Sequence, residues 1–320
     1  MLRIFKQNTP AQILVLLLSA ALLWAKAFIE PVPMEAGMHF SPLYDLLYEW
    51  LNTAPRLASA IALVLVIAEG IWLNIILVNY KIAKANSLMP TYLYFLAMSW
   101  STPSLTITPM LIVNIMIICA CSQMMSDGAT TLSVSKNFNA AFCIGMAALC
   151  YMPALCFIIP FLFIFVTYKL YRWRDIIVGF LGIVAPSIVL FTYAFLKDKL
   201  QYDLILIAHD FSSLDLSFGS IPFLTNLPDM VFVIILVASL FNALSSLNEK
   251  TVNQRINTTV LTLPLLASIS IMLLTGVLPI DAQLMAITFA FTANAFLYTE
   301  RKRRWISESL FWIILIAAIL

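Results

Sequence analysis

Long runs of apolar residues, separated by short polar segments, follow one another along the whole chain. A helix needs about 20 apolar residues to cross a bilayer, and fewer when its ends lie among the lipid headgroups. The pattern predicts about eleven such spans. They lie near 11–29, 57–78, 87–100, 104–121, 138–152, 154–168, 175–196, 229–246, 257–276, 280–298 and 305–320. We therefore expect an all-α fold, a polytopic transmembrane helical bundle.

Several of these spans are short for a full crossing. The segment 101–109, with two prolines, and the tripeptide Tyr151-Met152-Pro153 are the candidate turns beside the short spans. Proline interrupts a helix, so two helical hairpins are expected to be partly re-entrant. The run 305–320 would extend about 24 Å at about 1.5 Å per residue, and it is expected to end within the outer leaflet.

Composition agrees with the membrane interpretation. Hydrophobic residues make up 62% of the 320 residues and charged residues 11%, with a mean hydropathy of +0.97. Soluble domains contain about 45–50% apolar and about 25% charged residues, so a water-soluble fold is excluded. No segment between spans is long enough for a soluble domain, and we expect 1–320 to form a single transmembrane domain. The first apolar run continues to Ile29 without a small-residue cleavage site, which predicts an uncleaved first span.

Basic residues predict the orientation. With the N-terminus in the cytoplasm, all but four of the 18 Lys and Arg residues fall on the cytoplasmic side, as the positive-inside rule requires. The exceptions are Lys26, Arg56, Lys197 and Lys199. We expect a bacterial inner (cytoplasmic) membrane protein with a cytoplasmic N-terminus and an exterior C-terminus. Because the basic residues form short clusters between apolar runs, no nucleic-acid partner is expected.

Two longer exterior loops are predicted, at 30–56 and 197–229. In the first loop, Ser41 precedes Pro42 as an N-cap precedes the first helical residue, so 41–51 is predicted to be a helix. Its apolar residues share one face and its polar residues the other, which predicts an amphipathic helix on the membrane surface. The apolar face comprises Leu43, Leu46, Leu47, Trp50 and Leu51. The second loop is polar and turn-rich.

Acidic residues gather on the predicted exterior side, and polar loops in water are the ordinary explanation. The alternative is catalysis, because Glu30 and Glu35 lie where the first span leaves the bilayer and could take a proton from an acceptor hydroxyl. Lys26 lies four residues before Glu30 and could either pair with it or extend to the interface alone. Pairing would lower the pKa of Glu30, which favours Glu35 or Asp45 as the catalytic base.

Glu69 is the acidic residue that lies deep within a predicted span. An ionisable group at that depth is by default a hypothesis of function, here a proton relay or a cation site. The alternative is a protonated Glu69 that is hydrogen-bonded to an amide such as Asn114 or Asn294. Gly70 would then allow the neighbouring helix to approach closely. Both interpretations remain open.

A second candidate site lies in the exterior loops. His209 and Asp210, with Arg56, Lys197 and Lys199, could bind a lipid phosphate or pyrophosphate, and a solvated loop is the alternative. No zinc spacing can be completed with two His residues, and no metal site is expected. The five cysteines are interpreted as small apolar residues. The absence of phosphate-loop, dinucleotide and HExxH motifs excludes an ATP-driven pump, a nicotinamide enzyme and a zinc protease.

Several short segments occur in an order that resembles a known layout. They are the basic start Met1 to Pro10, Thr102-Pro103-Ser104, Phe138-Asn139-Ala140-Ala141-Phe142, Tyr151-Met152-Pro153 and Arg172-Trp173-Arg174-Asp175. This order resembles an uncharacterised family of bacterial polytopic inner-membrane proteins. The resemblance covers most of the first 200 residues and implies no particular activity.

More distantly, the layout is similar to the GT-C class of membrane glycosyltransferases and polysaccharide polymerases. That resemblance implies a polyprenyl-phosphate sugar donor, a juxtamembrane helix at 41–51 and a catalytic acid at Glu30 or Glu35. We therefore expect an envelope-biogenesis enzyme whose partners are membrane lipids, a lipid-linked sugar and envelope proteins. The resemblance to the GT-C class leaves open whether a divalent cation takes part. The alternatives are a transporter of a small molecule or lipid that uses Glu69, and a non-catalytic subunit of an envelope assembly complex.

Overall fold

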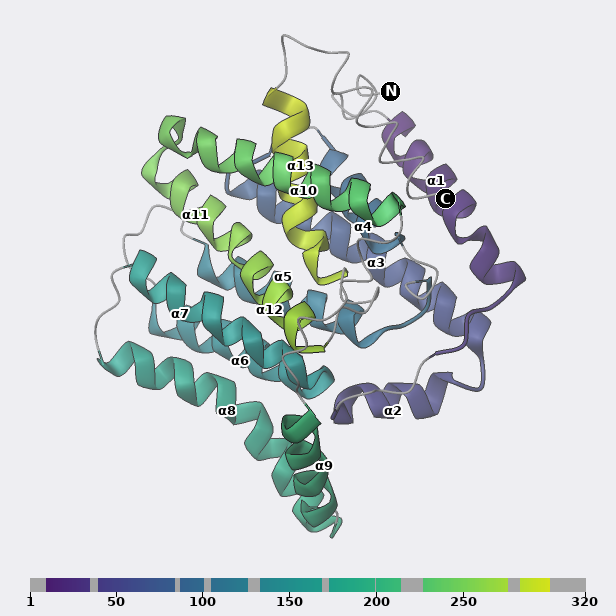
Figure 1. Ribbon diagram of the computed structural model, residues 1–320, viewed down its shortest axis with the longest axis vertical. Helices are drawn as coiled ribbons and strands as arrows, with labels where there is room; N and C mark the ends of the chain where they lie inside the picture. The colour runs from purple at the N-terminus through teal and green to yellow at the C-terminus, as the bar shows by residue number, and fades with distance from the viewer. Residues whose placement is uncertain are drawn as a thin grey trace.

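The computed structural model describes residues 10–34, 40–83, 87–100, 105–125, 133–168, 173–198, 200–213, 227–275 and 283–299. Within these ranges every regular element is a helix and none is a strand, which confirms the all-α prediction (Figure 1). Four helices are long and apolar enough to cross a membrane: Gln12–Ile29, Pro55–Asn79, Trp173–Leu196 and Val252–Leu274. They mark the chain as a membrane protein, whereas the total of about eleven spans and the orientation stay predictions.

The first half of the chain contains six helices among the described residues. They are α1 (Pro10–Ile29), α2 (Pro42–Leu51), α3 (Pro55–Asn79), α4 (Met89–Met98), α5 (Pro109–Met124) and α6 (Val134–Cys150). Proline occupies the first or second position of α2, α3, α4 and α5. Its fixed φ angle suits the first turn of a helix, where its missing N–H is not needed.

The second half begins with a break. The short 3₁₀ helix η3 (Met152–Phe157) follows α6 directly, so the predicted turn at Tyr151-Met152-Pro153 is confirmed. The remaining elements are α7 (Ile158–Thr167), α8 (Trp173–Leu196), α9 (Leu200–Ser213), α10 (Leu227–Ser245), η5 (Ser246–Glu249), α11 (Val252–Thr262), α12 (Pro264–Thr275) and α13 (Ala286–Thr299). The predicted last span, 305–320, lies outside the described residues.

Helix α4 forms the centre of the bundle. All ten of its residues are buried, and α3 and α13 pack directly against it (Figure 1). A helix of this length extends about 15 Å, half of the roughly 30 Å hydrocarbon core. The predicted span 87–100 is therefore a short helix enclosed by protein, which is the setting that tolerates irregular backbone at membrane depth.

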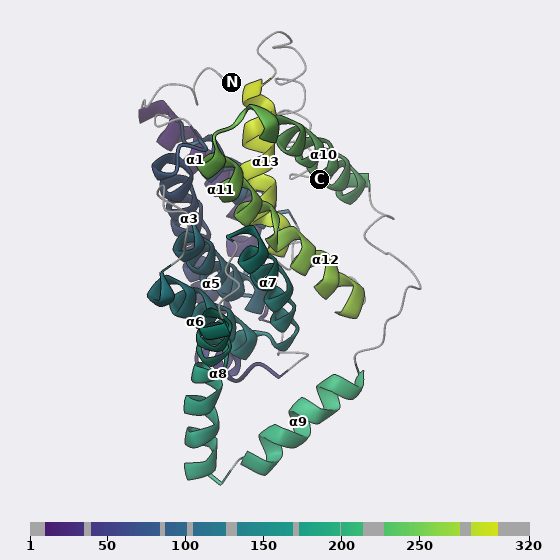
Figure 2. The same ribbon diagram turned by 90° about the vertical axis from the view of Figure 1, so that its left-hand side faces the viewer.

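Helices α6 and α8 pack closely against each other. A Cβ added to Gly182 of α8 would lie 2.7 Å from the Cβ of Ala141 and 2.8 Å from the Phe138 carbonyl oxygen of α6. Small residues allow such approach between membrane helices. The rest of α8 exposes large apolar side chains, among them Phe180 and Val189, as a lipid-facing helix would. Figure 2 shows α8 extending past the bundle, with α9 turning back at an angle.

Helices α2 and α9 lie at the same end of the molecule, which we call the α2 end (Figure 1). Helix α2 confirms the predicted helix at 41–51, with Ser41 at the N-cap. Helix α9 corrects the description of 197–229 as a turn-rich loop, because residues 200–213 are helical. Asp203 in its first turn interacts favourably with the helix dipole, and an unbroken apolar run at 204–207 follows it.

Candidate functional site

Helix α2 attaches to the bundle by one face and exposes the other. Tyr44 and Leu51 are buried, and the Tyr44 hydroxyl donates a hydrogen bond to the Ile107 carbonyl oxygen at 3.2 Å. Leu46 and Trp50 are exposed, Trp50 by 78%. This apolar exposure fits a helix that lies on a membrane surface.

The two predicted exterior loops meet at the α2 end. The Phe40 backbone N–H donates a hydrogen bond to the Asp210 carboxylate, which is buried. The bond joins the residues before α2 to the end of α9, across a sequence separation of 170 residues. Asp210 is therefore better placed to position α2 than to bind an anion.

Asp45 lies one helical turn after the N-cap of α2. The Ser41 hydroxyl donates a hydrogen bond to Asp45 Oδ1 at 3.2 Å. Partial burial raises the pKa of the Asp45 carboxyl above its usual value of 3.8, with the Ser41 hydroxyl lowering it and the Glu49 carboxylate raising it further. A general base works best when its pKa approaches the working pH, so this environment suits the role predicted for Asp45.

The other predicted catalytic acids are less well supported. The Glu30 backbone N–H donates to the Lys26 carbonyl oxygen at 2.8 Å, so the last turn of α1 reaches Glu30. Both side chains are exposed, and no ion pair joins them in the part of the chain that the structure describes. Glu35 lies outside the described residues. Asp45 is therefore the predicted acid whose surroundings favour catalysis.

The described members of the predicted phosphate-binding set lie on α3, just after α8 and on α9. Arg56 is exposed in the first turn of α3, and His209 is exposed on α9. Lys197, also exposed, follows α8 and holds its ammonium nitrogen 6.0 Å from the ring centroid of Tyr193. Lys199 lies outside the described residues. Their joint action on a phosphate stays a prediction.

Glu69 lies deep in the interior, with 2% of its surface exposed. The Tyr94 hydroxyl of α4 donates a hydrogen bond to Glu69 Oε2, whereas Oε1 has no partner among the described residues. The Thr91 hydroxyl donates to the Gly70 carbonyl oxygen at 3.0 Å, and a Cβ on Gly70 would lie 3.2 Å from Thr91. The predicted close approach at Gly70 is confirmed, but the observed partner of Glu69 is a tyrosine rather than an amide.

Further polar side chains continue from Tyr94. The Asn114 side chain lies within hydrogen-bonding reach of the Tyr94 hydroxyl, and its Nδ2 donates to the Gln283 carbonyl oxygen at 3.0 Å. The Thr108 hydroxyl donates to Gln283 Oε1 at 2.7 Å. We call Glu69, Tyr94, Asn114, Gln283 and Thr108 the Glu69 network. The sequence indicated only Glu69 and Asn114 as candidate partners. Tyr94, Thr108 and Gln283 gave no signal, because residues of these types are common in spans and at helix ends.

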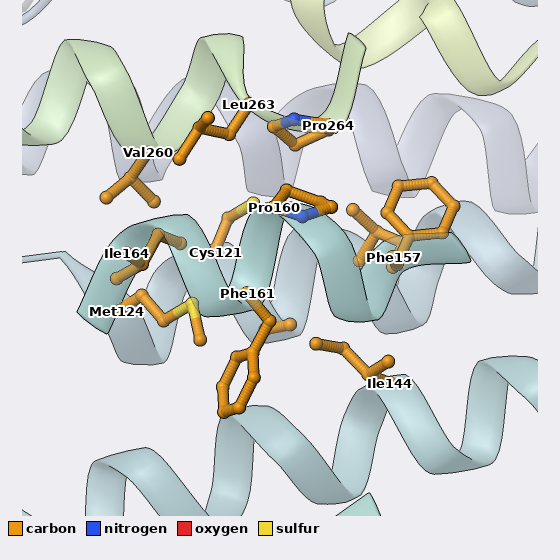
Figure 3. Close-up of a pocket in the computed structure, with 12 residues that line it drawn as sticks. Cys121, Met124, Ile144, Phe157, Pro160, Phe161, Ile164, Val260, Leu263 and Pro264 are labelled. Carbon is orange, nitrogen blue, oxygen red and sulfur yellow. The ribbon is translucent and has the colours of Figure 1, made fainter. Parts of the chain in front are cut away.

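A separate pocket lies between α5, α6, η3, α7 and the junction of α11 with α12 (Figure 3). It encloses about 290 Å³, including the part open to its surroundings. Its lining is apolar, with Cys121 and Met124 contributing sulfur atoms (Figure 3). In the described residues, no group of three His, Cys, Asp or Glu side chains could hold a metal ion.

Comparison with family models, curated proteins and solved structures finds no match to this chain. The membrane assignment therefore rests on the helices themselves. The resemblances to an inner-membrane family and to the GT-C layout stay expectations.

Proposed function

We propose that this protein is an envelope-biogenesis membrane enzyme that transfers a sugar from a polyprenyl-phosphate carrier at its α2 end. The observation that carries the proposal is the hydrogen bond between Phe40 and Asp210. It joins the residues before α2 to Asp210 near the end of α9, which supports a common site for Asp45 on α2 and His209 beside Asp210.

In this reaction Asp45 is the general base. It accepts the proton of the acceptor hydroxyl while the hydroxyl oxygen attacks the anomeric carbon of the sugar. The bond from that carbon to the phosphate oxygen breaks, and polyprenyl phosphate leaves with the electron pair. Arg56, Lys197 and His209 are the candidates to stabilise the phosphate by charge-assisted hydrogen bonds.

The exposed apolar face of α2 suits a lipid-linked donor. Leu46, Leu47 and Trp50 would lie among the lipids while Asp45 and Glu49 face the headgroups. A carrier whose chain stays in the bilayer would then present its phosphate at the depth of Asp45. No soluble domain is needed for this chemistry.

The test uses membranes that contain the full chain and a radiolabelled polyprenyl-phosphate hexose, with transfer to endogenous acceptors as the measurement. Removing a general base lowers a rate by about 10²- to about 10⁴-fold, so Asp45→Asn should lose almost all transfer. Glu49→Gln, a matched loss of charge on the same helix, should retain most of it. Full transfer by Asp45→Asn would refute the proposed role, and absence of transfer by the wild type would refute the proposed function.

The second candidate function is transport by way of Glu69, and the buried network around that carboxyl favours it. It predicts that uptake of a substrate into proteoliposomes depends on Glu69 and is unaffected by Asp45→Asn. If the chain is instead a non-catalytic subunit, substitution of Glu69 or of Asp45 should change neither transfer nor uptake.

A further inference from the structure

Polar groups connect Glu69 with the α2 end. Starting from Glu69, the Glu69 network passes through Tyr94, Asn114 and Gln283 to Thr108, which caps α5. The preceding carbonyl, that of Ile107, accepts a hydrogen bond from Tyr44 of α2. A single peptide unit separates these last two bonds. The path therefore runs from the middle of the bundle to the helix that lies at its surface.

Two oxygens in this path lack a donor. Glu69 Oε1 and Asn114 Oδ1 are both buried without a hydrogen-bond partner in the described residues. The Asn114 orientation is set by its Nδ2, which must donate to the Gln283 carbonyl oxygen. Both side chains meet at the Tyr94 hydroxyl. One proton on Glu69 would turn Oε1 from an acceptor without a donor into a hydroxyl, and the neutral acid is far less costly to bury than the carboxylate.

Tyr94 is the titratable group that contacts the carboxyl. Helices α1, α2, α4 and α5 pack against α3. The other titratable side chains that they carry are Lys26, Tyr44, Asp45, Tyr48, Glu49, Tyr92, Cys119 and Cys121. Of the basic residues, Lys26 on α1 and Arg56 on α3 itself are exposed. Among the described residues, no basic side chain pairs with the Glu69 carboxylate. A bound proton is therefore the way in which its charge would be neutralised.

We propose that Glu69 binds and releases one proton, and that the Glu69 network links it to the α2 end. On binding, the proton adds to Oε1, the carboxyl oxygen that has no hydrogen-bond partner among the described residues. On release, the carboxylate keeps the hydrogen bond from Tyr94. The path ends at the buried Ile107 carbonyl oxygen, which accepts the hydrogen bond from Tyr44 of α2. This proton site does not depend on the proposed sugar transfer.

The test is infrared difference spectroscopy of the full chain in liposomes, with ¹³C-labelled glutamate, between about pH 4 and about pH 10. A carbonyl band of a protonated carboxyl should decrease as the pH rises. It should be lost in Glu69→Gln and retained in Glu49→Gln, the matched surface control. A band that persists in Glu69→Gln, or one that does not change with pH, would overturn the proposal.

Conservative variants keep the test informative if Glu69→Gln fails to fold. Tyr94→Phe removes only a hydroxyl, and it should move the band to higher wavenumber because the carboxyl loses a hydrogen bond. Thr108→Val should slow the appearance of the band after a pH step, whereas Thr192→Val, on the exposed part of α8, should not. An unshifted band in Tyr94→Phe would contradict the assigned contact. Loss of the band on exchanging K⁺ for Na⁺ at constant pH would overturn the proton site in favour of an alkali cation.

Discussion

Replacing Gly145 by alanine should separate α6 from α8. A Cβ at this position would lie 2.3 Å from the Ile183 carbonyl oxygen and 2.8 Å from Pro186 Cγ. Ordinary van der Waals contact begins at 3.4 Å, so the helices would have to move apart by about 1 Å. The closest atom belongs to the backbone, so a change of side-chain rotamer cannot relieve the clash.

Overpacking a close-packed interior typically lowers the free energy of unfolding by about 1–3 kcal/mol, and we expect a loss of this size here. The α6 and α8 helices form the most extensive helix pair in the described chain, and their separation would also remove contacts along its length. The measurement is the free energy of unfolding of purified protein in mixed detergent–lipid micelles. Alanine lacks a flexible side chain and favours helix, so propensity alone would raise stability by about 1 kcal/mol.

Gly179→Ala is the matched control, because Gly179, on α8, is likewise a helical glycine at which an added Cβ would meet a neighbouring helix. Its Cβ would meet the ring of Phe161 at 3.1 Å and 3.3 Å and that of Phe165 at 3.3 Å, and the ends of these side chains can shift. Gly145→Ala should therefore be the more destabilised variant. Equal stability of the two variants, or a Gly145→Ala protein as stable as the wild type, would refute the close packing of α6 against α8.

Three further predictions concern stability. Trp24 is fully buried, and its indole N–H donates a hydrogen bond to Ser99 Oγ at 2.9 Å. Trp24→Ala should lower the free energy of unfolding by about 3–5 kcal/mol. Leu22→Ala, at a position 68% exposed, should lower it far less. Because burial raises the folded-state pKa of Asp45, its contribution to stability is fully present below pH 3.8 and is lost as the pH rises through the raised pKa. Asp45→Asn should thus be more stable than the wild type near neutral pH and equally stable in acid, and an advantage that grows in acid would contradict this sign. Thr251→Ala removes the capping box of α11 and should cost about 1 kcal/mol, a loss absent from Thr251→Ser.

Local signals predicted α2 well. Ser41 as N-cap and Pro42 as the first helical residue gave the observed start, and the end at Leu51 was also predicted. The faces were predicted only in part, because Leu51 of the predicted apolar face is buried against the bundle whereas Leu46 and Trp50 are exposed. These signals act within one or two turns, and no distant contact is needed to interpret them.

Helix α9 shows where local signals fail. His209 and Asp210 are typical of a loop, but Asp210 accepts a hydrogen bond from Phe40 and is buried. That bond depends on a residue 170 positions away, which periodicity cannot reveal. The predicted interpretation of 197–229 as a loop was therefore wrong over the helical residues 200–213.

The depth of Glu69 was predictable, and its partner was not. Hydropathy places the carboxyl within a span, and Gly70 beside it correctly indicated a close helix. Which side chain faces Glu69 depends on the rotation of α4, whose residues are all buried and carry no amphipathic pattern. A helix that is apolar on every side gives no indication of which residue meets which neighbour.

The most direct test of the account is the sidedness of α2. Cysteines would replace Glu49 on α2 and Arg255 at the start of α11, and intact cells would be treated with a membrane-impermeant thiol reagent. The account predicts labelling of Glu49→Cys in intact cells, and of Arg255→Cys only after permeabilisation. Labelling of Arg255→Cys alone in intact cells would place α2 and Asp45 in the cytoplasm and contradict the proposed exterior site.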